Sequence, residues 1–184
     1  MSGVADKVPS KHSPAPLKVH SMHSLAPLQD NSQTTAYCVS FTTFKREPLL
    51  ADIRGADAEM TPAGKIVLAV WRRLPSLYPN LQLDALAITH DEVHAILILV
   101  EPYFAEQEQV VGRFHETSDG LNRVVCGWKS TSSSEIKAAD AAAGMRVWSD
   151  GFSDRVLRND KEVELRRAYI LNNLFKWWLK DGKW

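Results

Sequence analysis

Glu92 and His94 are separated by one residue at the start of an apolar, strand-like run. Residues two positions apart in a strand point to the same face, so the carboxylate and the imidazole are expected to lie side by side. That combination suits a divalent cation such as Mg²⁺ or Mn²⁺. The alternative is a solvated glutamate beside a turn and a half-buried histidine, neither of which binds a ligand.

Tyr169 and Asn173 lie one helical turn apart near the C-terminus. An apolar stripe occupies nearly the opposite side of the expected helix and consists of Val163, Ile170, Leu171, Leu174 and Trp178. Packing of the helix therefore does not require a tyrosine at position 169. The alternatives are a functional tyrosine with a polar neighbour and a surface tyrosine that packs against a loop.

Arg155 and Arg158 form a third group, at the end of a strand-like segment that directly precedes this helix. Taken alone, the segment can equally be an edge strand whose charges prevent pairing with other chains.

Seven secondary-structure elements are expected to position these residues. Strands are predicted where β-branched and aromatic residues accumulate between turn residues, at 36–44, 81–89, 93–100 and 148–157. Helices are predicted where apolar residues recur at helical spacing, at 62–74, 121–143 and from 160 onward. Pro75 and Pro79 are expected to end the first helix.

Two helix starts carry clear capping signals. Thr61 precedes a proline at the first helical position, and Asn159 is followed three residues later by Glu162, as in a capping box. The first six elements have the order of a ferredoxin-like βαββαβ domain. The predicted fold is therefore α+β, with an antiparallel ferredoxin-like sheet and an additional C-terminal helix that carries Tyr169.

The charge balance argues against a protein that holds nucleic acid by bulk positive charge. The 184 residues include 22 Lys+Arg and 22 Asp+Glu, so the formal net charge is zero. The distribution is uneven, because residues 121–184 have 12 basic and 8 acidic side chains and residues 61–120 have 4 and 8. The basic surplus thus accompanies the C-terminal groups described above.

Residues 1–33 are rich in proline and serine and contain no aromatic residue, so they are predicted to be a flexible tail before a single domain at 34–184. The two cysteines cannot form a disulfide framework or a zinc site by their spacing. No apolar run approaches the roughly 20 residues of a membrane span. We expect a cytoplasmic protein without membrane partners.

Five segments, in the right order, resemble the REP-associated tyrosine transposases, a branch of the single-tyrosine HUH transposases. Residues 36–44 resemble the opening strand of that family, 89–96 its histidine motif and 128–133 its Phe-Lys-Ser segment. Residues 148–158 closely match its Trp-x-x-Gly-Phe-x-Asp-x-Val-Ile-Arg motif, and 169–174 its Tyr-Ile-x-x-Asn-Pro motif. The resemblance covers residues 36 to about 176.

The resemblance implies a role for each group. Tyr169 corresponds to the nucleophile that attacks single-stranded DNA and forms a 5′-phosphotyrosine link, leaving a free 3′-hydroxyl. His94 and Glu92 correspond to the ligands of a divalent cation, Mg²⁺ or Mn²⁺, and Asn173 to a polar residue that reaches the metal or the phosphate. The family binds hairpins in single-stranded DNA, as a monomer or a homodimer.

The basic side chains Lys129, Arg155 and Arg158 are expected to contact DNA phosphates, from their charge and placement.

Two positions depart from the family pattern. Glu92 replaces the first histidine of the metal-binding pair, and Leu174 replaces the proline that follows the tyrosine helix. A second hypothesis is therefore a catalytically decayed or domesticated protein that binds hairpin DNA or RNA on the same scaffold. A third is a protein-interaction module that uses C-terminal aromatic residues, namely Trp177, Trp178 and Trp184.

Overall fold

A computed structural model describes residues 34–54, 57–100, 116–140 and 146–181. The predicted tail at residues 1–33 lies outside these ranges.

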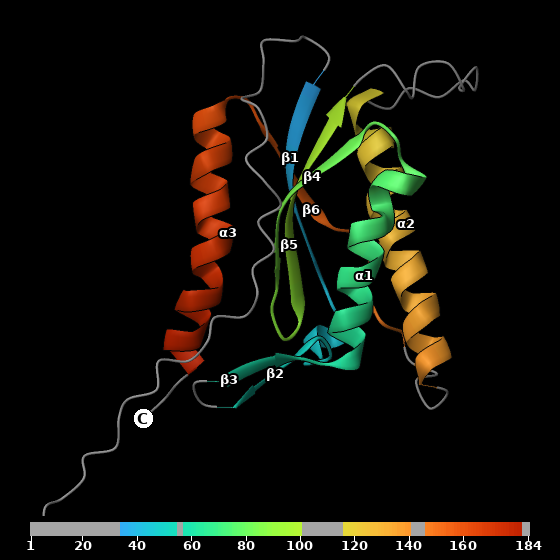
Figure 1. Cartoon of the computed structure of the whole chain (residues 1–184), viewed down its shortest axis with the longest axis vertical. Coiled ribbons are helices and arrows are strands. Elements are labelled where there is room, and N and C mark those ends of the chain that lie inside the picture. Colours follow the sequence, from blue (N-terminus) through green and yellow to red (C-terminus); the bar gives the residue numbers. More distant parts are fainter. Residues whose placement is uncertain (1–33, 55–56, 101–115, 141–145, 182–184) are drawn as a thin grey trace, which may run out of the picture.

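A four-stranded antiparallel sheet forms the centre of the molecule (Figure 1). Its strands are β1 (Thr34–Thr42), β4 (Leu81–Ile88), β5 (Glu92–Val100) and β6 (Ser153–Leu157). They lie in the order β4-β5-β1-β6, so that β1 pairs with both β5 and β6. This is the strand order of a ferredoxin-like sheet, and it confirms the predicted class and the predicted element order.

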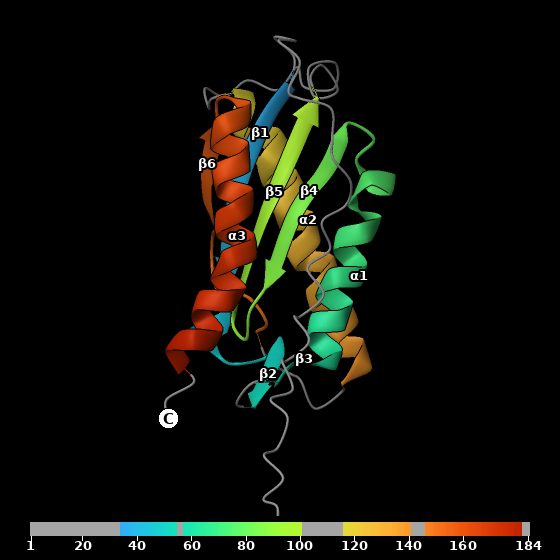
Figure 2. The same ribbon diagram turned by 60° about the vertical axis from the view of Figure 1, so that its left-hand side comes forward.

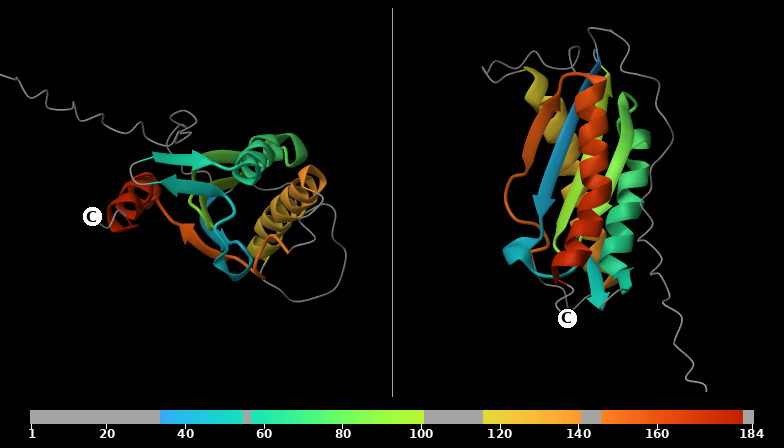
Figure 3. Two further views of the ribbon diagram at one scale, coloured as in Figure 1. Left: turned by 90° about the horizontal axis from the view of Figure 1, so that it is seen from below. Right: turned by 90° about the vertical axis from the view of Figure 1, so that its left-hand side faces the viewer.

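Helices cover both faces of this sheet. Helices α1 (Pro62–Leu77) and α2 (Glu116–Ala139) pack side by side on one face, and α3 (Asp160–Asp181) lies along the other (Figures 1 and 3). Figure 2 shows α3 running along the sheet, with β6 on one side of it and β4 on the other. Within the described residues, α3 is the one helix on this face of the sheet.

The face covered by α1 and α2 holds the larger core. Alternate residues of β1, among them Val39 and Phe41, point to this face, as the two-residue period of a strand requires. The ring of Phe41 contacts Trp128 and Trp148 edge-on, with centroids 5.0 and 4.9 Å away. Such edge-to-face contacts stabilise beyond the burial of their area.

The face covered by α3 holds a second cluster built from smaller side chains. Val163 and Ile170 of α3, seven residues apart and therefore on one side of the helix, are both buried in it. The strands contribute mainly alanine and isoleucine, namely Ala36, Ala85, Ala87, Ile96 and Ile98. Small residues on the strands allow the helix to approach the sheet closely.

Both predicted helix caps are confirmed. The hydroxyl of Thr61 accepts a hydrogen bond from Gly64 N at 3.1 Å, and Asn159 Oδ1 accepts one from Glu162 N at 2.9 Å. The carboxylate of Glu162 reaches back to the backbone N–H of Arg158 at 3.2 Å. These caps fix the start of α3 directly after β6.

Several predicted boundaries are wrong. The strand expected at 148–157 is interrupted, because Trp148 makes only an isolated bridge with Thr43 and Gly151 adopts a φ of 65°. Pro75 does not end α1, which continues to Leu77, and α2 ends at Ala139 instead of 143. These turns and ends depend on tertiary contacts that a local pattern does not contain.

A small second sheet was not expected from the sequence. It pairs two strands of four residues each, β2 (Ala51–Arg54) and β3 (Asp57–Met60), and it lies at the lower end of the molecule in Figure 1. Among the helices in the described ranges, none is both long enough and apolar enough to cross a bilayer.

Candidate functional site

Tyr169 lies on the flank of α3 and is 45% exposed. The next residue, Ile170, is fully buried against the sheet, and a rotation of about 100° per residue turns Tyr169 away from it. The guanidinium carbon of Arg166 lies 5.7 Å from the centre of the Tyr169 ring, a cation–π contact one turn earlier in the helix. The tyrosine is thus accessible and has a cationic neighbour, and the helix core does not use it.

A groove of about 280 Å³ opens beside this tyrosine, between α3 and the edge strand β6. Its lining, called the Tyr169 groove below, combines positive charge with apolar surface and consists of Arg155, Leu157, Glu162, Leu165, Arg166 and Tyr169. Of the predicted DNA contacts, Arg155 is therefore placed next to the predicted nucleophile.

Both arginines of this groove influence the thiol of Cys38 on β1. Cys38 of β1 is paired with Arg155 of β6 and packs against the cluster under α3. Burial raises the pKa of the Cys38 thiol, and the charges of Arg166 and Arg155 oppose that shift. Both arginine charges therefore reach the part of β1 that pairs with β6.

A largely buried ion pair fixes α3 on the opposite flank. Arg167 Nε and Nη2 donate to the two carboxylate oxygens of Asp84, at 2.8 and 2.5 Å. The hydrogen bond with Asp84 raises the pKa of Arg167. Glu164, one turn earlier, is also hydrogen-bonded to Arg167. Asp84 lies in the irregular part of β4, where the register with β5 shifts between Leu83 and Leu86.

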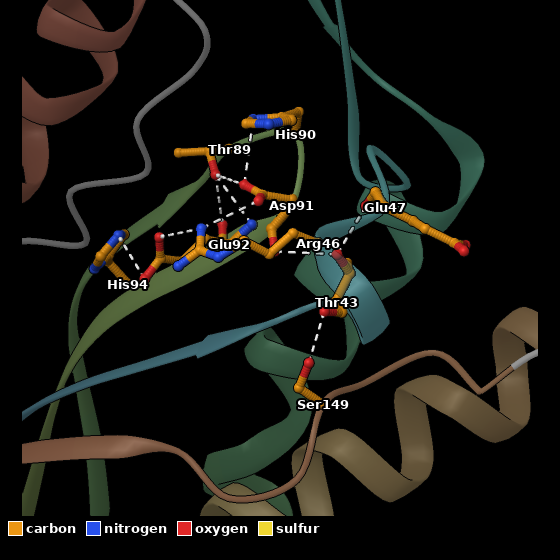
Figure 4. Close-up of polar contacts among 9 residues, drawn as sticks. All are labelled: Thr43, Arg46, Glu47, Thr89, His90, Asp91, Glu92, His94 and Ser149. Carbon is orange, nitrogen blue, oxygen red and sulfur yellow. Dashed lines mark hydrogen bonds and ion pairs between the residues drawn. The ribbon is translucent and has the colours of Figure 1, made fainter.

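Glu92 and His94 lie together at the start of β5, as predicted (Figure 4). His94 Nε2 and Glu92 Oε1 are 3.4 Å apart, and both side chains are largely buried. Burial lowers the pKa of His94, and the nearby carboxylate of Glu92 opposes that shift without reversing it. A neutral imidazole is the form that binds a metal ion.

An arginine from a strained turn completes the surroundings of this pair. Lys45 and Arg46 have φ values of 54° and 55°, in the left-handed region that side chains rarely adopt. Thr43 holds the turn, because its hydroxyl donates to Glu47 O at 2.7 Å and its N–H donates to Asp91 O at 2.8 Å. The strain is thereby maintained by specific hydrogen bonds.

The turn directs the guanidinium of Arg46 onto two carboxylates. Arg46 Nη1 lies 3.2 Å from Asp91 Oδ2 and 3.8 Å from Glu92 Oε2 (Figure 4). Asp91 is buried, whereas the side chain of Arg46 is 64% exposed. Asp91 contacts Arg46, Thr89 and His90, and Glu92 is shared between Arg46 and His94.

The Glu92–His94 pair provides two candidate ligands for a divalent cation. Within the described side chains, no group of three or more His, Cys, Asp or Glu residues is arranged to hold a metal. Mg²⁺ is commonly bound by one or two carboxylates together with waters and substrate phosphates. The pair fits a cation of this kind whose remaining positions are filled by water and substrate.

The pair and the Tyr169 groove lie on the same face of the sheet. His94 is paired with Ser40, and Arg155 with Cys38, two residues earlier on β1. Ordinary strand spacing and rise then place the Cα atoms of His94 and Arg155 about 12 Å apart, both on the side of α3. The predicted metal ligands and the groove beside Tyr169 therefore share one face of the sheet.

Lys129 holds the loop before β6 through hydrogen bonds that the sequence did not predict. Its ammonium group donates to Ser149 O at 2.8 Å and to Gly151 O at 2.5 Å, and it lies 5.7 Å from the ring of Phe41. Partial burial lowers the pKa of Lys129. Two of its three donors are therefore used within the chain, and its contact with DNA stays a prediction.

The remaining predicted residues lie along α3 and its start. Arg158 is exposed directly before the helix, so it stays a candidate DNA contact. Asn173 lies in α3 one turn after Tyr169, but its side chain is outside the described ones, as are those of Trp177 and Trp178; Trp184 is outside altogether.

Three important residues were missed by sequence reasoning. Arg166 was given no role, although its position one turn before Tyr169 was a usable signal. Arg46 and Asp84 carried no comparable signal. Their importance comes from a left-handed turn and from an irregular strand, which only the three-dimensional structure shows.

Comparison with known proteins identifies the fold. No protein-family model matches the chain. An uncharacterized protein from Haemophilus influenzae is 20% identical over 149 residues, which cover 77% of this chain and 81% of that protein. The structure of a REP-associated tyrosine transposase bound to a REP hairpin is similar with a TM-score of 0.52 and 15% identity, over 84% of this chain and 74% of that one.

A crystal structure of a candidate transposase from Deinococcus radiodurans is 14% identical, over 80% of this chain and 97% of that one, with a TM-score of 0.45. The first of the two solved structures shows that this chain has the fold of a REP-associated tyrosine transposase, as the sequence resemblance predicted.

Proposed function

We propose that this chain, with its transposase-like fold, is a DNA-processing enzyme of the single-tyrosine transposase type. It binds single-stranded or hairpin DNA and cleaves and rejoins it through a 5′-phosphotyrosine intermediate. One observation carries the proposal: an accessible tyrosine outside the helix core shares a sheet face with a buried carboxylate–imidazole pair. The solved structure with this fold was determined with a REP hairpin bound, which supports the choice of substrate.

The chemistry divides strand exchange into two transfers. The hydroxyl oxygen of Tyr169 attacks the phosphorus, the bond from phosphorus to the 3′-oxygen breaks, and the phenolic proton leaves as the 3′-hydroxyl gains one. A second 3′-hydroxyl then attacks the phosphotyrosine and releases the tyrosine. Because the energy of the phosphodiester is kept in the covalent link, no external energy source is needed for rejoining.

Other residues would bind the metal ion, bind the DNA and position α3. Glu92 and His94 would hold a divalent cation, which when bound polarises the phosphate and neutralises charge that develops on it. Arg155 on β6 and Arg158, the residue that follows this strand, are suited to DNA phosphates. Asp84 and Arg167 hold α3 against the sheet, so the position of Tyr169 relative to the pair is set by the fold.

A second candidate function is non-catalytic binding of hairpin DNA or RNA on the same scaffold. It is favoured by the contact of Arg46 with Glu92, since a guanidinium that already neutralises this carboxylate competes with a metal ion. The two candidates predict the same affinity for hairpins and differ in covalent chemistry.

The test is the formation of a covalent adduct. The protein is incubated with Mn²⁺ or Mg²⁺ and labelled single strands that contain hairpins, and adducts are separated under denaturing conditions. The enzyme predicts an adduct that is absent in Tyr169→Phe and present in Tyr78→Phe, a matched control whose hydroxyl contacts Arg123 O on the other side of the sheet.

Tight hairpin binding without an adduct, across both metals and a panel of hairpins, would overturn the enzyme and leave the binding protein. Absence of any affinity for nucleic acid would overturn both, and would favour the protein-interaction module.

A further inference from the structure

We propose that the Tyr169 groove binds one nucleotide of a DNA single strand, next to the phosphodiester that Tyr169 attacks. The phosphate is held by Arg155 and Arg166, and the sugar and base lie on the apolar wall formed by Leu157 and Leu165. This inference rests on the proposed function and assigns a substrate-binding role to Leu165 and Arg166, residues outside the sequence-based site.

The charge of the groove suits a phosphate. Two guanidinium groups and one carboxylate, Glu162, line it, which leaves a positive surplus. The carboxylate accepts a hydrogen bond from Arg158 N, two residues before α3, so part of its charge is used within the chain. Arg155 and Arg166 come from different elements, β6 and α3, and both line the groove. Guanidinium groups bind phosphates through pairs of parallel hydrogen bonds.

The apolar wall suits a sugar and a base. Leu165 is 62% exposed and Tyr169 is 45% exposed, and they are two of the four exposed large apolar residues in the described part of the chain. Leu157, buried on β6, lies behind them. Exposed apolar side chains beside arginines form the combination that single-stranded nucleic acid requires, because unpaired bases offer their faces for packing.

The volume of the groove is suited to a ligand the size of one nucleotide. Its volume of about 280 Å³ lies just below the usual range for ligand pockets, roughly 300–1,000 Å³. A duplex presents its bases in a stack and cannot insert one without unpairing it. The groove is therefore expected to prefer a single strand over a duplex of the same length.

The experiment measures non-covalent binding in a Tyr169→Phe background, which prevents an adduct and keeps the ring. A fluorescein-labelled 12-nucleotide deoxythymidine strand is titrated at several salt concentrations, with a 12-base-pair duplex as comparison. Variants are Arg155→Ala, Arg166→Ala and Leu165→Ala, with Lys137→Ala as a charge-matched control, an exposed cation at the end of α2 on the opposite face.

Each arginine variant is expected to weaken single-strand binding roughly 10-fold. Each should also reduce the slope of log affinity against log salt by about 0.7, the value for one phosphate contact on a single strand. Leu165→Ala should weaken binding roughly threefold with an unchanged slope, since it removes only apolar contact.

Effects on single-strand binding no larger than that of Lys137→Ala would overturn the groove assignment, as would equal losses for strand and duplex. Circular dichroism and urea unfolding of each variant show whether a loss reflects unfolding. If the groove variants bind single strands normally, the groove assignment is wrong, but adduct formation by the wild-type protein is still possible. If the groove variants weaken binding as expected and the wild-type protein forms no adduct, only the catalytic proposal is contradicted.

Discussion

Arg167 of α3 and Asp84 of β4 meet through two hydrogen bonds, Nε to Oδ1 at 2.8 Å and Nη2 to Oδ2 at 2.5 Å. The side chain of Asp84 is 5% exposed and that of Arg167 is 22% exposed. This pair is a polar link between α3, the helix that carries Tyr169, and the sheet. Its neighbours, Val163 and Ile170, provide the apolar contact.

Asp84→Asn is expected to lower the free energy of unfolding by about 2–3 kcal/mol, because the largely buried guanidinium of Arg167 loses its bidentate partner and keeps only the exposed carboxylate of Glu164. Urea denaturation measures the change. Arg73→Met is the control, since its pair with Glu135 is exposed and contributes about 0–1 kcal/mol. An equal effect of the two variants would contradict the importance given to the buried pair.

The Glu92–His94 pair is expected to determine affinity for Mn²⁺. Glu92→Gln and His94→Ala should each weaken binding by about 10-fold or more, by loss of a ligand. Arg46→Ala should strengthen it by about 3- to 10-fold, because a positive charge 3.8 Å from Glu92 is removed. Electron paramagnetic resonance titration of Mn²⁺ reports both, with Glu135→Gln as a control at a carboxylate of α2, on the other face of the sheet.

Unchanged Mn²⁺ affinity in Glu92→Gln would exclude the pair as the metal site. A weaker affinity in Arg46→Ala would instead show that the arginine supports the site and does not compete for it.

Stability is expected to fall in acid in a way that depends on His94. Burial lowers its pKa in the folded chain, below the value of about 6.5 of an unfolded chain. As the pH falls through 6.5, protons therefore bind the unfolded chain first and stability is lost, until the folded His94 is protonated as well. Urea unfolding at pH 7.5, 6.5 and 5.5 in EDTA should show a smaller loss for His94→Gln than for the wild type.

Lys129 is expected to affect stability more than DNA binding. Lys129→Met removes donors to Ser149 O and Gly151 O and should cost about 1–2 kcal/mol. Its effect on single-strand affinity should be smaller than that of Arg155→Ala, whose side chain lines the Tyr169 groove. A larger loss of affinity in Lys129→Met, in a folded protein, would restore Lys129 as a main DNA contact.

Much of the fold was predictable because its signals are local. Thr61 and Asn159 predicted two helix starts, and the apolar runs at 81–89 and 93–100 predicted the central hairpin. The strand before α3 was placed in the right region, but its start was wrong because Gly151 breaks the extended backbone. The order of these elements was sufficient to identify a ferredoxin-like sheet.

The candidate site was predictable only in part. Glu92 and His94 are neighbours along one strand, so their proximity follows from the strand period. The Tyr169 groove depends on the register between β1 and β6, which sets Arg155 beneath α3, and a single sequence does not contain that register. Arg46 reaches Asp91 only through two consecutive left-handed residues that are not glycine.

The unequal faces of the sheet have a consequence for local unfolding. In the described part of the chain, α1 and α2 enclose large aromatic side chains, whereas α3 covers mainly alanine and isoleucine. Helix α3 should therefore detach at a lower free energy than global unfolding requires, and its amides should exchange with deuterium before those of β1 and β5. The tyrosine helix then forms a separate cooperative unit, so a bound DNA strand that bridges α3 and β6 slows exchange along the whole helix.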